Sequence, residues 1–197
     1  SQLWYNFYET VENLPTIDYE NITLLTDGSG YLSSFIVQFA YYLCHPISTS
    51  SDYIGYIENA LEADKLWWSS QEGAKSYMYG LGAGSSISGS GYHADSIGNN
   101  PGLTVSPHII AGFLPFYSEV KNDLIYLLEN NYGVYSFTDN NIDVLWRFSL
   151  FDDSWIPGDV QGVDYALMLL GLASDSLGSD FFSTYNDFFE SNEDTFP

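Results

Sequence analysis

The sequence predicts an all-α fold in which inner and outer helices alternate, arranged as half of a double-layered helical toroid. Two observations support this prediction. Segments that are apolar on most sides alternate with segments whose apolar residues recur at helical spacing, and no low-complexity linker divides the 197 residues. A helix that is apolar all round must be covered on every side, and an amphipathic helix can cover it from outside. We therefore expect one domain over residues 1–197.

The expected helices form three inner–outer pairs. The apolar inner helices are expected at 31–44, 105–113 and 163–173, and the amphipathic outer helices at 51–68, 117–130 and 180–191. His45-Pro46 ends the first inner helix, because proline cannot continue a helix. Ser50, Ser51 and Asp52 are candidate N-caps of the first outer helix.

The later elements follow from the same reasoning. Segment 117–130 places four apolar residues at helical spacing, Val120, Leu124, Leu127 and Leu128. Segment 180–191 alternates aromatic residues with acids. The long connections, 69–104 and 131–162, are expected at one rim, where loops carry function more often than helices do. A closed toroid needs a second half, so that half lies on another chain or the domain closes by other means.

The charge of the chain excludes several classes of partner. Asp and Glu number 26 against four basic residues, which gives a net charge of −22. Nucleic acids and anionic membranes need clustered Lys and Arg, so neither is an expected partner. No apolar run is long enough to span a bilayer. The composition suits a protein outside the cell or at its surface, with stability that depends on salt and pH.

Two single residues bear on the compartment of the protein. Cys44 is the sole cysteine, so no internal disulfide can form, and its apolar surroundings predict an inert buried thiol. Asn21 begins the sequon Asn21-Ile22-Thr23, which can be glycosylated if the chain is secreted from a suitable cell. The sequon therefore carries weight only together with an extracellular location.

Five short blocks occur in an order that resembles the glycoamylase-like family, which includes bacterial β-1,2-glucanases. The blocks are YGLGAG at 79–84, GYHA at 91–94, VSP at 105–107 with LPF at 114–116, YGVYSFTD at 132–139 and GVD at 162–164. The resemblance implies an (α/α)6 toroid of which this chain is the C-terminal half. It also implies a polysaccharide or oligosaccharide substrate of the β-glucan type, hydrolysed with two carboxyl groups.

The same resemblance singles out one carboxylate and one departure. Asp164 matches the family's aspartate on the base side of the reaction. The family's acid is a glutamate in an upstream block, and by spacing Leu32 stands at that position. The residues after the aspartate also differ, since Tyr165-Ala166-Leu167 replaces Gln-Gly-Pro.

The candidate catalytic residues are carboxylates because glycoside hydrolysis needs a protonated acid and an ionised partner. Asp164 stands at the start of an apolar helix, where the helix dipole would stabilise its charge. The alternative is that Asp164 only caps that helix. Asp95 and Asp139 lie in loops and are candidate acids, with solvated loop carboxylates as the alternative.

Aromatic and imidazole side chains supply candidate sugar-binding groups. Aromatic rings can stack on sugar faces, and core packing is the alternative for each of them. The candidates are Tyr79, Tyr92, Trp146 and Trp155 for stacking, with His93 and His108 for sugar hydroxyls. The histidines lack the helical spacing of a zinc pair, so no metal is expected there.

One segment resembles the opening of a calcium loop. Asp139, Asn141 and Asp143 follow the D-x-N-x-D pattern, but Val144 and Leu150 replace the glycine and glutamate that such a loop needs. A plain acidic turn is the preferred interpretation, and no cofactor is expected.

The sequence leaves two functions open. In the first, the chain is a carbohydrate-active domain, and Leu32 at the acid position argues against catalysis. Alternatively it is a non-catalytic relative that binds glycans or serves as a structural subunit of an extracellular assembly. Both hypotheses include a partner chain, or self-association, that completes the toroid.

Overall fold

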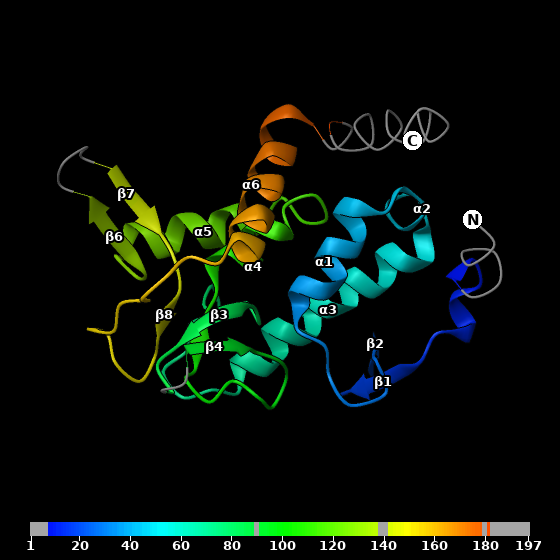
Figure 1. The fold of residues 1–197 in the computed structure, drawn as a ribbon, viewed down its shortest axis with the longest axis horizontal. Coiled ribbons are helices and arrows are strands. Elements are labelled where there is room, and N and C mark those ends of the chain that lie inside the picture. Colours follow the sequence, from blue (N-terminus) through cyan, green and yellow to red (C-terminus); the bar gives the residue numbers. More distant parts are fainter. Residues whose placement is uncertain (1–7, 89–90, 138–141, 179–180, 182–197) are drawn as a thin grey trace, which may run out of the picture.

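Figure 1 shows a computed structural model of the chain, which describes residues 8–88, 91–137, 142–178 and 181. The helices of this part are α1 (Ser34–Leu43), α2 (His45–Ser48), α3 (Ser51–Ser69), α4 (Pro107–Gly112), α5 (Val120–Glu129) and α6 (Gly162–Leu177). A 3-10 turn, η2 (Val11–Asn13), precedes them. Five of the six expected helices are thereby confirmed within a few residues of their predicted bounds. Most of the sixth, 180–191, lies outside the described residues.

The prediction of an all-α fold is confirmed only in part: the chain is rich in helix, but eight short strands join the helices within the described residues. They are β1 (Thr16–Tyr19), β2 (Ile22–Leu25), β3 (Ala83–Ser86), β4 (Gly91–Ala94), β5 (Thr104–Val105), β6 (Val134–Phe137), β7 (Ile142–Leu145) and β8 (Phe148–Ser149). They pair antiparallel as β1–β2, β3–β4, β5–β8 and β6–β7. Most of them lie in the two long connections, where hairpins satisfy backbone groups that a loose loop would leave to water.

Helix α4 is the centre of the core, and all six of its residues are buried. It begins with Pro107, whose fixed φ suits the first helical position. Helix α1 is tied to it by two side chains: Gln38 donates to the Ile109 carbonyl over 2.8 Å, and Tyr42 donates to the Gly112 carbonyl over 2.9 Å. These buried hydrogen bonds fix α1 against α4.

Helix α6 packs closely against α4 at Gly171. A Cβ atom at Gly171 would collide with the carbonyl of Ala111, so only glycine permits this approach of the two backbones. In Figure 1, α6 rises over α4 beside α1, while α3 runs along α1 and α5 lies beside α4. The inner–outer pairing of α1 with α3 and of α4 with α5 therefore follows the prediction. The described helices alone do not make a closed ring.

A buried carboxylate joins three distant segments of this core. Asp64 of α3 accepts hydrogen bonds from the backbone N–H groups of Gly80 and Leu81, over 3.0 and 2.8 Å, and from the Ser34 hydroxyl over 3.1 Å. Its side chain is fully buried. Burial raises the pKa of Asp64 to about 7, although these hydrogen bonds oppose the shift.

Three features bear on the cellular environment of the protein. Among the described residues, no helix is both long enough and apolar enough to cross a bilayer. Asn21, the sequon residue, is exposed in the β1–β2 turn with φ of 69°. Cys44 is a free, half-buried thiol. Glycosylation of Asn21 stays a prediction.

Candidate functional site

Asp164 lies in the first turn of α6. The residue is 0% exposed. Neither of its carboxylate oxygens has a hydrogen-bond partner among the described residues, so it makes no capping bond to the α6 backbone. The simple capping role is therefore not what this geometry shows. The carboxylate instead faces side chains that come from α4 and from the β7–β8 connection.

His108 of α4 is the first of these neighbours. Its Nε2 atom lies 3.5 Å from Oδ1 of Asp164, which is long for a hydrogen bond and makes the contact mainly electrostatic. The ring is fully buried, and Trp146 stacks on it at a centroid distance of 5.1 Å. Burial lowers the pKa of His108, and the Asp164 carboxylate opposes that shift.

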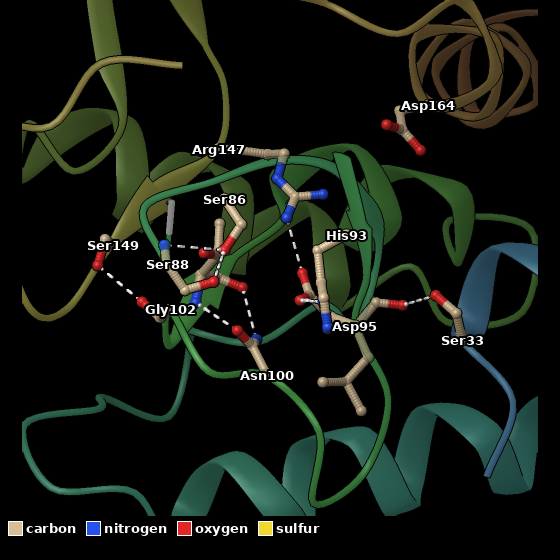
Figure 2. A network of polar contacts seen from close by, with 12 residues as sticks. Ser33, Ser86, Ser88, His93, Asp95, Asn100, Gly102, Arg147, Ser149 and Asp164 are labelled. Atoms are coloured by element: carbon tan, nitrogen blue, oxygen red, sulfur yellow. Dashed lines mark hydrogen bonds and ion pairs between the residues drawn. The ribbon is translucent and has the colours of Figure 1, made fainter. Parts of the chain in front are cut away.

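Arg147 is the second neighbour and belongs to a buried polar chain. Its Nη2 atom donates to Oδ2 of Asp95 over 2.7 Å, and Oδ1 of Asp95 lies 2.8 Å from Nδ1 of His93. Figure 2 shows these contacts, with Asp164 above them at the end of α6. The Arg147 and Asp95 side chains are 1% and 0% exposed. Burial raises the pKa of Asp95, and Arg147 opposes that shift.

The backbone around Arg147 holds it in place. The backbone N–H of Trp146 donates to the Gly133 carbonyl over 2.8 Å, and the Tyr135 hydroxyl donates to the Arg147 carbonyl over 2.7 Å. Two residues later, the Ser149 hydroxyl donates to the Gly102 carbonyl over 2.7 Å. The short β5–β8 pair and the β6–β7 hairpin therefore fix the start of the Arg147 side chain from both sides.

Gly84 of β3 lies where Asp164 and Arg147 come together. A Cβ atom there would be 2.9 Å from Oδ2 of Asp164 and 3.1 Å from Nη1 of Arg147. The φ of Gly84 is 136°, a conformation that residues with side chains rarely adopt. Glycine at this position therefore serves both the backbone of the β3–β4 hairpin and the approach of the two charged groups.

Two tyrosines lie at the surface beside this buried cluster. Tyr92 of β4 and Tyr165 of α6 are 52% and 46% exposed. Partial burial raises the pKa of Tyr92, and the next largest cause is the charge of Asp164, so its hydroxyl is within electrostatic reach of the cluster. The Tyr165 ring contacts Trp146 at a centroid distance of 6.3 Å. Both are exposed aromatic rings, which present a flat apolar face to solvent.

The structure separates the predicted site residues into two groups. It brings together Asp164, Asp95, His93, His108, Trp146 and Tyr92. Tyr79 instead lies in the core, where its hydroxyl donates to Asp123 over 2.9 Å and Lys65 lies over its ring. Trp155 is half-buried in the connection before α6, and none of its described contacts joins it to Asp164.

The predicted acid and calcium positions fare differently. Asp139 and Asn141 lie outside the described residues, and Asp143 accepts a hydrogen bond from the Ser136 hydroxyl over 2.6 Å. Within the described ranges, no group of His, Cys, Asp and Glu is arranged to hold a metal ion. Leu32 is half-buried and lines a small pocket with Leu24, Ser33 and other uncharged residues, so none of the residues lining this pocket carries a carboxyl group.

Sequence reasoning did not identify Arg147. The available signal was its composition: it is the sole arginine of a chain with 26 acids, and it stands within the apolar run Leu145-Trp146-Arg147-Phe148. A cation in such a run is rarely buried unless it is paired. The pattern therefore indicates a buried ion pair, but not which of the many carboxylates is the partner.

Solved structures share this arrangement of elements. A proposed glucoamylase from Bacteroides uniformis is 17% identical, with a TM-score of 0.66 over 89% of this chain and 43% of that one. The endo-β-1,2-glucanase of Chitinophaga pinensis, solved with sophorotriose and glucose, is 19% identical, with a TM-score of 0.64 over 84% of this chain and 41% of that one. The chain has a glucoamylase-like fold.

A third similar structure, a proposed glucoamylase from Bacteroides caccae, gives a TM-score of 0.65 at 18% identity, over 85% of this chain and 43% of that one. The chain thus spans less than half the length of each of these glucoamylase-like proteins. No protein-family model and no curated protein matches its sequence. At this level of identity, the likeness concerns the fold alone.

Proposed function

We propose that this chain is a carbohydrate-active domain that binds a β-glucan-type oligosaccharide at the Asp164 site. The observation that carries the proposal is the Asp164 carboxylate, whose two oxygens have no hydrogen-bond partner among the described residues. Such a group is costly to bury and well suited to accept hydrogen bonds from hydroxyl groups. The exposed rings of Tyr92 and Tyr165 lie beside it for stacking.

Glycoside hydrolysis needs a second carboxyl group beside Asp164, so the proposal covers binding and not catalysis. Asp95 is a candidate acid, but one of its oxygens is bonded to Arg147 and the other to His93. Leu32 supplies no carboxyl. We therefore expect binding without efficient hydrolysis.

Titration calorimetry with sophorotriose tests the proposal, combined with reducing-sugar release from β-1,2-glucan. Asp164→Asn should weaken binding about tenfold, because it removes a charged acceptor. Asp52→Asn is the matched control, since Asp52 also lies in the first turn of a helix but is exposed. Tyr92→Ala tests the same site through an exposed residue that the core does not need.

The outcomes separate clearly. Weaker binding in both Asp164→Asn and Tyr92→Ala, with Asp52→Asn like the wild type, supports the site. A wild-type chain that binds no gluco-oligosaccharide contradicts the proposed function. Substantial sugar release that Asp164→Asn abolishes would instead establish a complete hydrolase.

A second candidate function is that of a subunit in an extracellular assembly. It is favoured by apolar residues on α1 and α6 that face solvent: Ile36, Leu43, Tyr165, Leu169 and Leu172 are 41–66% exposed. The similar structures are more than twice as long as the part that matches. We propose that a partner chain or a second copy covers these faces and completes the ring.

Light scattering over a range of salt concentrations tests the assembly. A dimer or larger species that Leu169→Asp dissociates supports it, because a buried interface does not accept an unpaired charge. Leu66→Asp, on the exposed side of α3, is the control and should leave the mass unchanged. A monomer at every salt concentration contradicts assembly of this chain with itself.

A further inference from the structure

Two buried polar atoms of the site face the same position without a protein partner. Oδ2 of Asp164 and Nη1 of Arg147 belong to side chains that are each 1% exposed. Neither atom has a hydrogen-bond partner among the described residues. Leaving such groups unpaired in a dry interior costs free energy on the order of 1–3 kcal/mol each. The pair therefore needs something that satisfies both atoms at once.

The spacing of the two atoms limits what that can be. They do not form a direct ion pair, although Arg147 does so with Asp95. The position that a Cβ atom would take at Gly84 is 2.9 Å from Oδ2 and 3.1 Å from Nη1, so the two atoms are at most about 6 Å apart. One oxygen atom with two hydrogen bonds spans roughly 5–6 Å between a donor and an acceptor. The distance between Oδ2 and Nη1 is too long for an ion pair, and it suits one oxygen that bridges the two atoms.

Charge and hydrogen-bond type then select the ligand. A guanidinium only donates and a carboxylate only accepts, so the bridging group must accept from Nη1 and donate to Oδ2. An O–H group does both. A metal cation would be repelled by Arg147, and an anion by Asp164. We propose that Arg147 and Asp164 form a binding site for one neutral hydroxyl oxygen, taken by water in the free protein and by a sugar hydroxyl in the complex.

The rest of the polar chain preorganises this site. Asp95 holds the Nη2 side of the guanidinium, and His93 holds the other oxygen of Asp95. Arg147 therefore presents Nη1 in a fixed direction and loses little further freedom when the oxygen arrives. Arg147 is thus a ligand-binding residue, and Asp95 is a residue that positions it. The sugar part of this inference rests on the proposed function, and the water part does not.

Crystal structures of the full chain, free and soaked with sophorotriose, test the inference. We expect one oxygen within hydrogen-bond distance of both Oδ2 and Nη1 in the free crystal, replaced by a sugar hydroxyl in the soaked one. A direct ion pair between the two atoms, or a gap without density, overturns it. If the sugar binds elsewhere while the water stays, the proposed binding site fails and the oxygen site stands.

A substitution test in solution complements the crystals. Gly84→Ala places a methyl group between the two atoms, and we expect sophorotriose to bind at least about tenfold more weakly. Gly30→Ala is the matched control: Gly30 has a φ of 157° but no atom within 4 Å of a Cβ, so it shares the unusual backbone without the obstruction. Equal sugar affinity in the two folded variants contradicts the bridging site.

Discussion

Nε2 of His108 lies 3.5 Å from Oδ1 of Asp164, and neither residue is accessible to solvent. The two residues come from α4 and α6, which are in contact along the core. Burial lowers the pKa of His108, with the carboxylate acting in the opposite direction. The imidazole is therefore neutral in the folded protein near neutral pH, and its contact with Asp164 orients the ring without forming a full ion pair.

We expect His108 to make the protein less stable as the pH falls below about 6.5, the pKa of an unperturbed histidine. In that range the unfolded chain takes up a proton at His108 and the folded chain does not, so acid favours unfolding. Urea unfolding at a series of pH values should show a smaller loss for His108→Gln than for the wild type. Parallel curves for the two proteins would contradict this assignment.

Asp64 should act with the opposite sign. Its pKa is raised from 3.8 to about 7 by burial, so the folded chain keeps a proton that the unfolded chain has lost. Stability contributed by the protonated group is then lost as the pH rises from about 4 to about 7. Asp64→Asn, which cannot ionise, should be less destabilising at about pH 7 than at about pH 4.5. An equal cost at both pH values would show that Asp64 does not titrate in this window.

The contact of Gly171 with Ala111 gives a test of packing. Gly171→Ala should lower the free energy of unfolding by about 1–3 kcal/mol, because the added methyl group meets the Ala111 carbonyl. Gly55→Ala is its matched control, since Gly55 lies within α3 and a Cβ there meets no atom within 4 Å. That variant should gain about 0.5–1 kcal/mol from helix propensity. Thermal unfolding followed by circular dichroism measures both.

The net charge of −22 predicts a marked dependence on salt. Four basic residues cannot pair with 26 acids, and the unpaired acids repel one another in the compact state. The midpoint of thermal unfolding should rise between about 0.1 M and about 1 M sodium chloride, as the Debye length shortens from about 10 to about 3 Å. Asp52→Lys should reduce the slope slightly, and an unchanged midpoint across this range would contradict the expectation.

The helices could be predicted because their patterns are local. In α5, for example, Val120 and Leu127 are buried while Lys121 and Asn122 face solvent, as helical spacing requires. Strand β3 was missed because it reads Ala83-Gly84-Ser85-Ser86, which has none of the branched or aromatic residues that mark strands. Strands β6 and β7 contain such residues, but four residues are too few to show an alternating pattern. The β3–β4 hairpin forms because Gly84 can adopt its φ and because Arg147 and Asp164 pack against it.

The candidate site could be predicted only in part, for the same reason. Asp164, Asp95 and His93 are predictable because they lie in or next to short blocks that resemble the glycoamylase-like family, whereas Arg147 lies 52 residues from its partner Asp95. No local pattern tells which of 26 acids pairs with one arginine. The aromatic candidates divide between surface and core, as Tyr92 and Tyr79 show, because ring chemistry alone does not fix burial.

The shortness of α4 has a consequence for how the site is lost on unfolding. A helix of six residues cannot persist in water by itself, since nucleation costs more than so few hydrogen bonds return. It exists only while α1 and α6 enclose it, and it carries His108. The amide hydrogens of Ile110 and Phe113 should therefore exchange with solvent only when the whole chain opens, at the slowest rate in the molecule. Local fluctuations therefore cannot dismantle the floor of the site separately from the fold.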